Sequence, residues 1–370
     1  MSNILCKKMA YMSVMLCFFI LGFANVDATN QDIGFYVLKK GDTSVNLTNW
    51  GASIVSVVLP DRNGKLGDIV LGYDSIKEYQ NDSTYFGALV GRVANRIGNA
   101  QFKLNGTQYK LIANDGKNTL HGGPRGFSDV AWKVRKYHKD GHAPYIVFTY
   151  HSFDGEQGFP GDLFVSVSYT LFGNRQLHVS MKAKALNKPT PVNLAQHTYW
   201  NLGGHNSGNI LSNDIKIFAS HFTAVDANLI PTGKIEPVKG TPYDFLKPRS
   251  VGSRINKLPK GYDINYVLDG DYNSKKLKPV AVVYDRKSGR FMELSTDAPG
   301  VQFYTANYVK DLKGKSGFVY QAHAALCLET QGFPDAVNHP NFPSTIVTKV
   351  KPYKHNMLFK FSTKLVPSFS

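Results

Sequence analysis

Strict alternation of apolar and other side chains, with a period of two residues, is the feature that most constrains how this chain folds. The run from 163 to 172 has Leu, Val, Val, Tyr and Leu at its odd positions, and a run from 177 to 184 repeats the pattern. A period of two is typical of a β-strand with one buried face. The turn Phe172-Gly173-Asn174-Arg175 lies between the runs and predicts a β-hairpin.

Strand signals recur along the chain, whereas helix signals are scarce. The segment Ser75-Ile76-Lys77-Glu78 has the spacing of a capping box and predicts one short turn of helix. No run keeps a period of 3.6 residues, and no internal repeat is evident. We therefore expect an all-β protein, a large antiparallel β-sandwich that starts near Asp32. Further strands are predicted at Ile54–Leu59, Tyr145–Tyr150, Val280–Tyr284 and Met357–Phe361.

The first residues have the three-part pattern of a secretory signal. Lys7 and Lys8 precede an apolar run that ends at Ala24, and Val26-Asp27-Ala28 offers small residues for cleavage. We predict a cleaved signal peptide over residues 1–28 and a single domain over residues 29–370, exported to the extracellular space. A retained membrane anchor is the alternative, but the apolar run is shorter than the ~20 residues that a span needs.

Export changes how the cysteines and asparagines of the chain are interpreted. Cleavage would leave Cys327 as the sole cysteine, so no internal disulfide is expected. Asn-X-Ser/Thr acceptors become available for N-glycosylation in the secretory pathway. Such triplets also arise by chance. The sequence contains three Asn-X-Ser/Thr triplets, which begin at Asn46, Asn81 and Asn105.

The chain is strongly basic. Removal of Lys7, Lys8 and Asp27 with the signal takes the formal charge from +16 to +15, which favours polyanionic partners. Nucleic acid is not expected as a partner, because the sequence has neither a basic run with aromatics nor a known binding motif. Acidic polysaccharide is the expected polyanion for an exported protein, and solubility alone is the simpler explanation. No membrane contact is expected after signal cleavage.

A buried strand that ends in a carboxylate gives the first candidate for chemistry. Four apolar residues, Ala325 to Leu328, precede Glu329, and Gly332 and Pro334 then break the strand. A buried carboxylate is costly unless another group pairs with it or uses it. Glu329 is therefore expected at the mouth of a cavity. The alternative is an edge-strand glutamate that faces water.

Four other stretches carry polar residues that the strand pattern does not require. Each has a structural alternative: a turn histidine, a hydrogen-bonded core histidine or a capping aspartate. The two glycines of the second stretch would let the backbone approach a ligand closely. The stretches are GRVANRI at 91–97, TLHGG at 119–123, VNLAQHTYWNL at 192–202 and GYDIN at 261–265.

Together these stretches resemble the aldose 1-epimerases, a family also called galactose mutarotases. The resemblance runs in order from about Phe35 to Phe361 and implies a supersandwich fold. It also implies interconversion of the α and β anomers of free aldoses such as galactose and glucose, with no cofactor. The resemblance is carried by Asn95-Arg96 in GRVANRI, His121 in TLHGG, His197 in HTYWNL, Asp263 in GYD, Gln302 in GVQFYT and Glu329 in LETQGFPDAVN.

The resemblance also implies roles for these residues. Glu329 matches the general base and His197 the general acid. The positions that hold the sugar hydroxyls or assist the acid are matched by Asn95, Arg96, His121, Asp263 and Gln302. One departure is Ile264, since many members have histidine directly after this aspartate, which puts contacts from that position in doubt.

The chemistry explains the residue types. Ring opening removes a proton from the anomeric hydroxyl while the ring oxygen gains one, so a base and an acid must act together. Burial would raise the pKa of a carboxylate base, and histidine is the expected acid near neutral pH. Tyr199 and Trp200 are expected either to face the sugar ring or to pack in the core. No metal site is expected, since His323, His339 and His355 are widely scattered.

Two other functional classes remain open. One is a binding or trafficking protein that keeps the fold and uses the cavity only to hold a sugar. The other is an enzyme acting on a sugar phosphate or a non-sugar hemiacetal. A phosphate would need arginines near the cavity, and the candidates within or beside the motifs are Arg92, Arg96 and Arg125.

Overall fold

The predicted hairpin forms strands β12 (Leu163–Phe172) and β13 (Gln176–Ala185), which pair without interruption from Leu163 opposite Ala185 to Phe172 opposite Gln176. The alternation predicted one buried face, and the odd-numbered residues of both strands are buried. This description comes from a computed structural model that covers residues 32–271, 274 and 276–365. The predicted signal peptide and its cleavage site before Thr29 lie outside the described residues.

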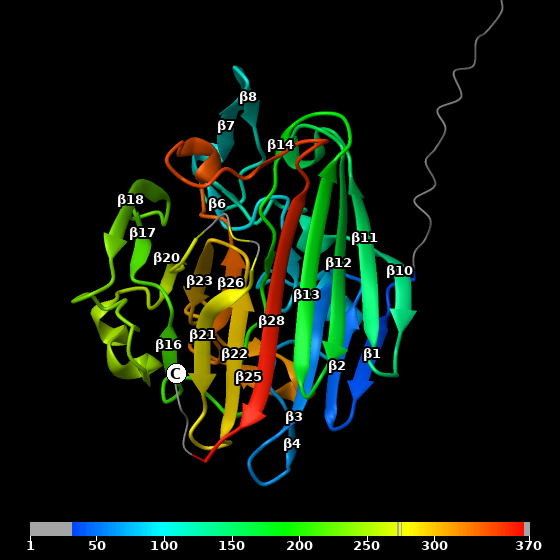
Figure 1. The fold of residues 1–370 in the computed structure, drawn as a ribbon, viewed down its shortest axis with the longest axis vertical. Coiled ribbons are helices and arrows are strands. Elements are labelled where there is room, and N and C mark those ends of the chain that lie inside the picture. Colours follow the sequence, from blue (N-terminus) through cyan, green and yellow to red (C-terminus); the bar gives the residue numbers. More distant parts are fainter. Residues whose placement is uncertain (1–31, 272–273, 275, 366–370) are drawn as a thin grey trace, which may run out of the picture. The chain divides into compact units, whose positions relative to one another are not determined.

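The hairpin lies within a nine-stranded antiparallel sheet (Figure 1). Every other strand predicted from the sequence forms within one or two residues of the expected end or extends further. In order across the sheet, the strands are β10 (Lys133–His138), β11 (Tyr145–Ser152), β12, β13, β28 (Tyr353–Thr363), β22 (Arg290–Thr296), β21 (Lys278–Tyr284), β16 (Asp214–Ile217) and β19 (Arg249–Ser250).

Two smaller antiparallel sheets contribute to the same core. One core cluster contains Val45 from the four-stranded sheet, Val165 from the nine-stranded sheet and Phe303 from the five-stranded sheet, all 0% exposed. Residues from Ile33 onward form one compact unit. The four-stranded sheet is β1 (Phe35–Lys40), β2 (Thr43–Thr48), β3 (Ser53–Pro60) and β4 (Leu66–Asp68); the five-stranded sheet is β18 (Pro231–Pro237), β17 (His221–Val225), β20 (Asp263–Val267), β23 (Gly300–Tyr304) and β26 (Cys327–Gln331).

Short elements connect the sheets. The predicted capping box is present at α1 (Ile76–Gln80), where the Ser75 side chain accepts from the backbone of Glu78 and Glu78 accepts from the backbone of Ser75. Within the described residues, no helix is long and apolar enough to span a membrane. The two-stranded pairs are β5 (Leu89–Val90) with β15 (Ala195–Gln196), β6 (Arg96–Ile97) with β9 (Thr119–Leu120), β7 (Gln101–Leu104) with β8 (Thr107–Lys110), β14 (Thr190–Pro191) with β27 (Ile346–Val347), and β24 (Leu312–Lys313) with β25 (Val319–Tyr320).

Single 3₁₀ turns complete the connections. They are η1 (Gly98–Ala100), η2 (Phe127–Asp129), η3 (Glu156–Gly158), η4 (Val251–Ser253), η5 (Ile255–Lys257), η6 (Lys315–Gly317) and η7 (Ala336–Asn338).

The five-stranded sheet is unusual because two of its strands, β23 and the edge strand β26, are buried along their whole length. All five residues of β23 and of β26 are buried. Alternation places Val301 and Phe303 in the core, whereas Gln302 and Tyr304 point to the opposite face and line a pocket. Gln302 on β23 and Glu329 on β26 therefore belong to a site and not to a solvent-exposed edge.

Candidate active site

A pocket of about 180 Å³ opens over the five-stranded sheet. It receives residues from the sheet, from the β6–β9 pair and from the segment after β15, which are distant in sequence. All seven site residues predicted from the sequence line this pocket: Asn95, Arg96, His121, His197, Asp263, Gln302 and Glu329.

Strand register builds the floor of the pocket. Gln302 on β23 lies directly opposite Glu329 on β26, so their side chains project from the same face. The Nε2 atom of Gln302 donates to Oδ1 of Asp263 at 2.7 Å, which links β20 to the other two strands. Glu329 is only 2% exposed, which excludes the alternative of a water-facing edge glutamate.

Asn95, just before β6, and His121, just after β9, form part of the wall of the pocket. The backbone N–H of His121 donates to the carbonyl of Asn95 at 3.0 Å, and the backbone N–H of Asn95 donates to Nδ1 of His121 at 3.1 Å. Since Nδ1 accepts, the proton of neutral His121 is on Nε2, which makes that atom a hydrogen-bond donor. Both residues have positive φ, 59° for Asn95 and 51° for His121, and their reciprocal hydrogen bonds join the segment before β6 to the segment after β9.

Gly122, the first glycine after His121, has a role different from the one expected. Its φ is +91°, and a Cβ there would lie 2.0 Å from the carbonyl oxygen of Gly91. The glycine therefore allows two backbone segments to meet, and the expectation of close backbone approach to a ligand is wrong at this position.

Arg96 is positioned by groups on both sides of the pocket. Its Nε donates to Asp115 at 2.7 Å, and the Arg96 side chain is 12% exposed. The carbonyl of Arg96 accepts from the backbone N–H of Asp335 at 3.1 Å, and Oδ1 of Asp335 accepts from the backbone N–H of Gly98 at 3.1 Å. Asp335 thus ties the loop of Arg96 to the segment that follows β26.

His197 follows β15 and lies beside Glu329. The backbone N–H of His197 donates to Ala88 at 2.8 Å, and its ring stacks on Tyr199 with centroids 5.1 Å apart. Its Nδ1 lies 3.8 Å from Sγ of Cys327, and its Nε2 lies 3.6 Å from Oε2 of Glu329. The two groups proposed for proton transfer are therefore neighbours, separated by slightly more than a hydrogen bond.

Burial moves the pKa values of this pair in opposite directions. Desolvation raises the pKa of Glu329 well above its usual range; the nearby charge of Asp263 adds to this, and Arg96 opposes it. Desolvation lowers the pKa of His197 to about 4. Both shifts favour the uncharged forms, a protonated Glu329 beside a neutral His197. The expectation that His197 titrates near neutrality is wrong, because the ring is buried.

Two oxygen atoms in the pocket have no partner in the described protein. They are Oε2 of Glu329 and Oε1 of Gln302, both buried. Unpartnered buried acceptors are rare because each costs desolvation free energy that no hydrogen bond returns. A ligand with several hydroxyl groups would satisfy both.

His121, His197 and Glu329 also form a group that the sequence did not reveal as possible metal ligands. Their ligand atoms all lie within 4.8 Å of one another. Zinc sites with bonds of about 2.0–2.2 Å need closer donors. The Nδ1 atom of His121 is already occupied by the backbone of Asn95. The spacing suits a substrate held between acid and base better than an ion bound by all three.

Most aromatic residues of the pocket were not predicted from the sequence. Tyr85, Tyr304 and Tyr308 line the pocket, and Tyr308 stacks on Tyr304 with an interplanar angle of 24°. A tyrosine in a strand-rich sequence carries no signal that separates a pocket wall from a core position. Tyr199 lines the pocket, whereas Trp200 packs in the core against Phe359 with ring centroids 5.0 Å apart.

The position of Ile264 in the fold shows what its departure from the family pattern changes. It is 2% exposed and belongs to the central core, on the face of β20 opposite to Asp263. A side chain at this position does not reach the pocket, so the loss of a histidine there removes no contact within it.

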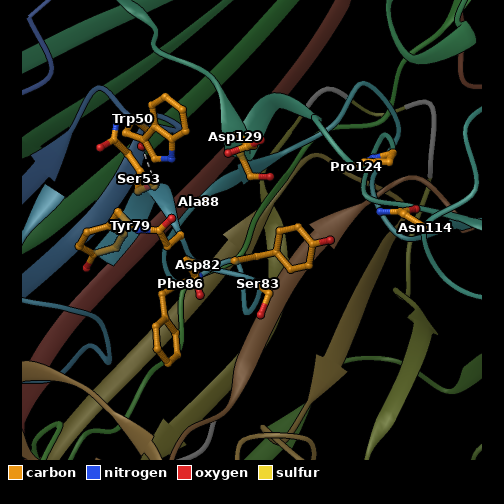
Figure 2. Close-up of a pocket in the computed structure, with 14 residues that line it drawn as sticks. Trp50, Ser53, Tyr79, Asp82, Ser83, Phe86, Ala88, Asn114, Pro124 and Asp129 are labelled. Atoms are coloured by element: carbon orange, nitrogen blue, oxygen red, sulfur yellow. Dashed lines mark hydrogen bonds between the residues drawn. The ribbon is translucent and has the colours of Figure 1, made fainter. Parts of the chain in front are cut away.

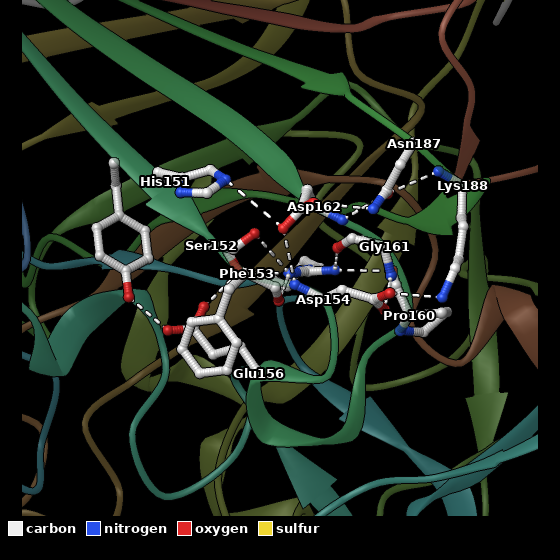
Figure 3. Close-up of polar contacts among 12 residues, drawn as sticks. His151, Ser152, Phe153, Asp154, Glu156, Pro160, Gly161, Asp162, Asn187 and Lys188 are labelled. Atoms are coloured by element: carbon white, nitrogen blue, oxygen red, sulfur yellow. Dashed lines mark hydrogen bonds and ion pairs between the residues drawn. The ribbon is translucent and has the colours of Figure 1, made fainter. Parts of the chain in front are cut away.

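The three candidate phosphate-binding arginines have different environments. Arg92 is 2% exposed, and its guanidinium donates to the carbonyls of Pro160 at 2.9 Å and Gly161 at 2.8 Å. Figure 3 shows Pro160 and Gly161 among the polar contacts of Asp154, Asp162 and Lys188. Arg125 is 72% exposed and lies near Asp129. Only Arg96 lines the pocket, where it is paired with Asp115. This arrangement gives no cluster of free guanidinium groups for a phosphate.

Similarity to known proteins agrees with the geometry. A family model described as aldose 1-epimerase matches residues 34–360. Galactose mutarotase of Sus scrofa is 44% identical over 329 residues, which are 88% of this chain and 93% of that protein. Aldose 1-epimerase of Escherichia coli K12 is 32% identical, with 81% of this chain and 86% of that protein covered.

Solved structures give the same result. The GalM/aldose epimerase homologue from C. elegans superposes with a TM-score of 0.84 at 30% identity, covering 90% of this chain and 99% of that one. The galactose 1-epimerase from Lactobacillus acidophilus NCFM has a TM-score of 0.79 at 25% identity, covering 90% and 96% of the two chains.

Proposed function

This chain belongs to the aldose 1-epimerase family, and we propose that it interconverts the α and β anomers of free aldoses such as glucose and galactose through Glu329 and His197. The activity is that of an isomerase that opens and recloses the sugar ring. The observation that carries the assignment of roles is the 3.6 Å separation of Nε2 of His197 from Oε2 of Glu329 inside a pocket lined with hydrogen-bonding groups.

The proposed reaction requires that Glu329 and His197 together carry one proton. The Glu329 carboxylate takes the proton of the anomeric hydroxyl, protonated His197 gives its proton to the ring oxygen, and the C1–O5 bond breaks to leave an aldehyde. Rotation about C1–C2 presents the other face of the aldehyde. The ring then recloses: the former ring hydroxyl returns its proton to His197, and Glu329 returns its proton to the new anomeric oxygen.

The opposite pKa shifts fit this cycle. Glu329 protonated with His197 neutral is the form that burial favours, and it is also the form that accompanies the open-chain aldehyde. The form that starts the cycle, with Glu329 ionised and His197 protonated, contains the same number of protons. Burial therefore stabilises the protonation state of the pair at the midpoint of the reaction, when the open chain must persist long enough to rotate.

The other residues of the pocket have binding roles in this proposal. Gln302 and Asp263 form one hydrogen-bonded unit that offers an unpartnered acceptor to sugar hydroxyls. Arg96 supplies a fixed positive charge, and neutral His121 supplies a donor at Nε2. Tyr304 and Tyr308 are placed to face the apolar side of a pyranose ring.

Polarimetry tests this function directly. Freshly dissolved α-D-glucose and α-D-galactose should approach their equilibrium rotation faster in proportion to added protein, after the spontaneous rate is subtracted. An unchanged rate with folded protein would contradict the assignment and favour a sugar-binding protein of the same fold.

Export and glycosylation form a separate part of the proposal, supported by the sequence pattern of residues 1–28. We propose that the mature protein is extracellular and starts near Thr29, which N-terminal sequencing of secreted material tests. The exposed Asn105, at the tip of the β7–β8 hairpin, is the best-placed glycosylation acceptor. Asn46 lies within β2, paired with β1 and β3, where a glycan has little room.

The basic surface supports a further proposed partner, acidic polysaccharide. The charge of +16 for the whole chain would attract it through screened surface interactions. Retention on a polygalacturonate or heparin matrix should fall steeply as salt rises. Elution that does not depend on salt would contradict polysaccharide binding and indicate that the positive charge serves only solubility.

A further inference from the structure

The solvent-facing side of the nine-stranded sheet has no role in the proposed reaction. In β12 and β13 the odd-numbered residues are buried in the core, so the even-numbered residues point away from it. The pocket that contains Glu329 is on the other side of that core. Val165 of the nine-stranded sheet and Phe303 of the five-stranded sheet share one core cluster, and Gln302 points away from that cluster into the pocket. A ligand on the solvent-facing side would therefore leave the pocket open.

Strand pairing aligns polar side chains in rows across this side of the sheet. Figure 1 shows β10, β11, β12, β13 and β28 next to one another in this order. With neighbouring strands about 4.8 Å apart, a row over five strands extends roughly 19 Å. The central row consists of Lys133, Thr149, Ser166, Lys182 and Lys354, each directly opposite the next.

The rows on either side of the central row add further positive charge. One consists of Lys136, Val147, Ser168, Ser180 and Asn356, and the other of His151, Phe164 and Lys184. None of the residues in the three rows carries a carboxylate. All five lysines are exposed, and together they are called the basic face: Lys133, Lys136, Lys182, Lys184 and Lys354.

The lysines of the basic face have no counter-charge within the described part of the chain. The ion pairs that lysines form elsewhere join Lys188 to Asp154 and Lys315 to Asp68. None of the five lysines forms such a pair with another described residue. The positive charge of the basic face is therefore available to a partner.

The two aspartates that border the rows are already engaged. The carboxylate of Asp297 accepts the backbone N–H of Asn356 at 2.7 Å and its side-chain amide at 2.6 Å. The carboxylate of Asp162 accepts the backbone N–H of Asp154 at 3.0 Å and Nδ2 of Asn187 at 2.8 Å. These hydrogen bonds hold both carboxylates at the border, away from the lysines.

One pair of lysines gives an independent indication of a polyanionic partner. Lys182 on β13 is directly opposite Lys354 on β28. Like charges at directly opposite positions of an antiparallel pair destabilise the sheet. Solubility alone would be served equally well by lysines spaced apart. A bound polyanion would compensate the repulsion between these two.

The other side chains of the rows indicate which polyanion fits. The hydroxyl groups of Ser166, Ser168 and Ser180 lie between the lysines and can bind sugar hydroxyls. Phe164 is 45% exposed and lies directly opposite Lys184, so it offers an aromatic face to a sugar ring. An anionic membrane would favour more apolar side chains than the two in the rows, Val147 and Phe164. Single-stranded nucleic acid would need several aromatic rings for its bases to stack on.

From the aligned rows, the uncompensated lysine pair and the hydroxyl groups between the charges, we propose that the basic face binds a linear acidic polysaccharide through its carboxylate or sulfate groups. This inference rests on the acidic partner proposed above from net charge, and it assigns that partner a location. The bound chain lies on the side of the core opposite to the pocket. The enzyme would then be held on the polysaccharide with its active site free.

Replacement of three lysines by glutamine tests the location. The variant Lys182→Gln/Lys184→Gln/Lys354→Gln keeps the side-chain length and removes three charges. Its Kd for heparin and for polygalacturonate at low salt should rise about 5- to 50-fold, the combined effect of three exposed charge pairs. The matched control removes three exposed lysines outside the rows and should change Kd less than about twofold. This control is Lys65→Gln/Lys239→Gln/Lys257→Gln.

Two further measurements keep the result interpretable. Because the triple variant relieves the repulsion between Lys182 and Lys354, its melting temperature should equal or exceed that of the unsubstituted protein. Weaker binding would then not come from unfolding. Mutarotation of glucose should stay within about twofold in the triple variant, and also in the unsubstituted protein saturated with heparin. Loss of mutarotation on heparin binding would overturn the placement away from the pocket.

The remaining outcomes separate this inference from the proposals on which it rests. Equal weakening in the triple variant and its control would overturn the basic face and leave acidic polysaccharide as a partner of the whole charged surface. Equally tight, face-dependent binding to single-stranded DNA or to phosphatidylserine vesicles would overturn the assignment to polysaccharide. Binding that is absent or independent of salt would contradict the acidic partner itself. None of these outcomes depends on the epimerase activity, because each is measured as binding.

Discussion

The Nε2 atom of His197 lies 3.6 Å from the Oε2 atom of Glu329, in a site where both side chains are almost fully buried. The contact joins the segment after β15 to the last strand of the five-stranded sheet. Because burial disfavours both charges, the pair holds one proton over a wide pH range instead of forming a permanent ion pair. This shared proton is the basis of the first two predictions.

Replacement of Glu329 by glutamine should remove most activity and keep the fold. The amide has the shape of the carboxylate but cannot accept the proton of the anomeric hydroxyl, so kcat should fall by about 10²–10⁴-fold. Mutarotation rates and a thermal melt measure the two effects. Glu293→Gln, at an exposed strand position, is the control. A wild-type rate in Glu329→Gln would remove the glutamate from the mechanism.

The pH profile of kcat/KM should be bell-shaped. The usual assignment, in which the carboxylate gives the rising limb and the histidine gives the falling limb, should be reversed. Below about pH 4 both groups are protonated, and above the raised pKa of Glu329 neither is, so the singly protonated pair is active between these limits. The rising limb therefore reports His197, and the falling limb reports Glu329. Rates must be corrected at each pH for the spontaneous reaction.

The variant His197→Asn tests that assignment. Without the acid, the residual rate depends only on the fraction of Glu329 that is ionised. This rate should therefore rise with pH through the raised pKa of Glu329 and then level off. The rate itself should drop by about 10²–10⁴-fold. His142→Asn, at an exposed loop position, serves as the control. Persistence of the falling limb would exclude His197 as the acid, and His121 would become the next candidate.

Asp335 should act as a positioning residue for Arg96. In Asp335→Ala the Oδ1 acceptor for the Gly98 backbone N–H is lost, which loosens the loop between Arg96 and Gly98. KM for the aldose should rise about 3- to 10-fold while kcat changes less, because Arg96 binds and does not transfer protons. Steady-state kinetics measured well below the melting temperature separate this effect from instability, with Asp140→Ala for comparison. Unchanged KM would assign Asp335 a purely structural role.

Trp200→Ala should destabilise the fold without altering substrate preference. Trp200 is 1% exposed and packs on Phe359 and Phe361, so its truncation should cost about 3–5 kcal/mol of unfolding free energy. Denaturant unfolding measures the cost. A stable variant with a raised KM would instead make Trp200 a surface for the sugar ring.

If the protein is exported as proposed, glycan occupancy should differ among the three acceptors. Asn105 is exposed in a hairpin turn, whereas Asn46 lies in a paired strand and its Oδ1 atom is buried. Asn105→Gln should remove glycan mass from the secreted protein, and Asn46→Gln should change that mass little. Intact-mass spectrometry before and after enzymatic deglycosylation distinguishes these outcomes. Full loss of glycan in Asn46→Gln alone would contradict this ranking.

The sequence by itself determined the strands and the identity of the candidate residues. A period of two fixes which side chains of β12 and β13 share a face, since a shift by one residue would expose the whole apolar set. The capping box at Ser75 was equally readable, because its bonds join residues three apart. Glu329 and His197 were identified by their motifs before any geometry was known.

Tertiary structure decided what those residues experience. The inverted pKa values of His197 and Glu329 come from desolvation, which depends on every group that packs around them and not on the local sequence. Tyr199 and Trp200 are adjacent and similar in type, yet one lines the pocket and the other fills the core, because successive residues of extended chain point in opposite directions. A second cavity of about 350 Å³, lined by Trp50, Tyr79 and Asp129 among others (Figure 2), forms only where segments distant in sequence meet, so no single motif predicts it.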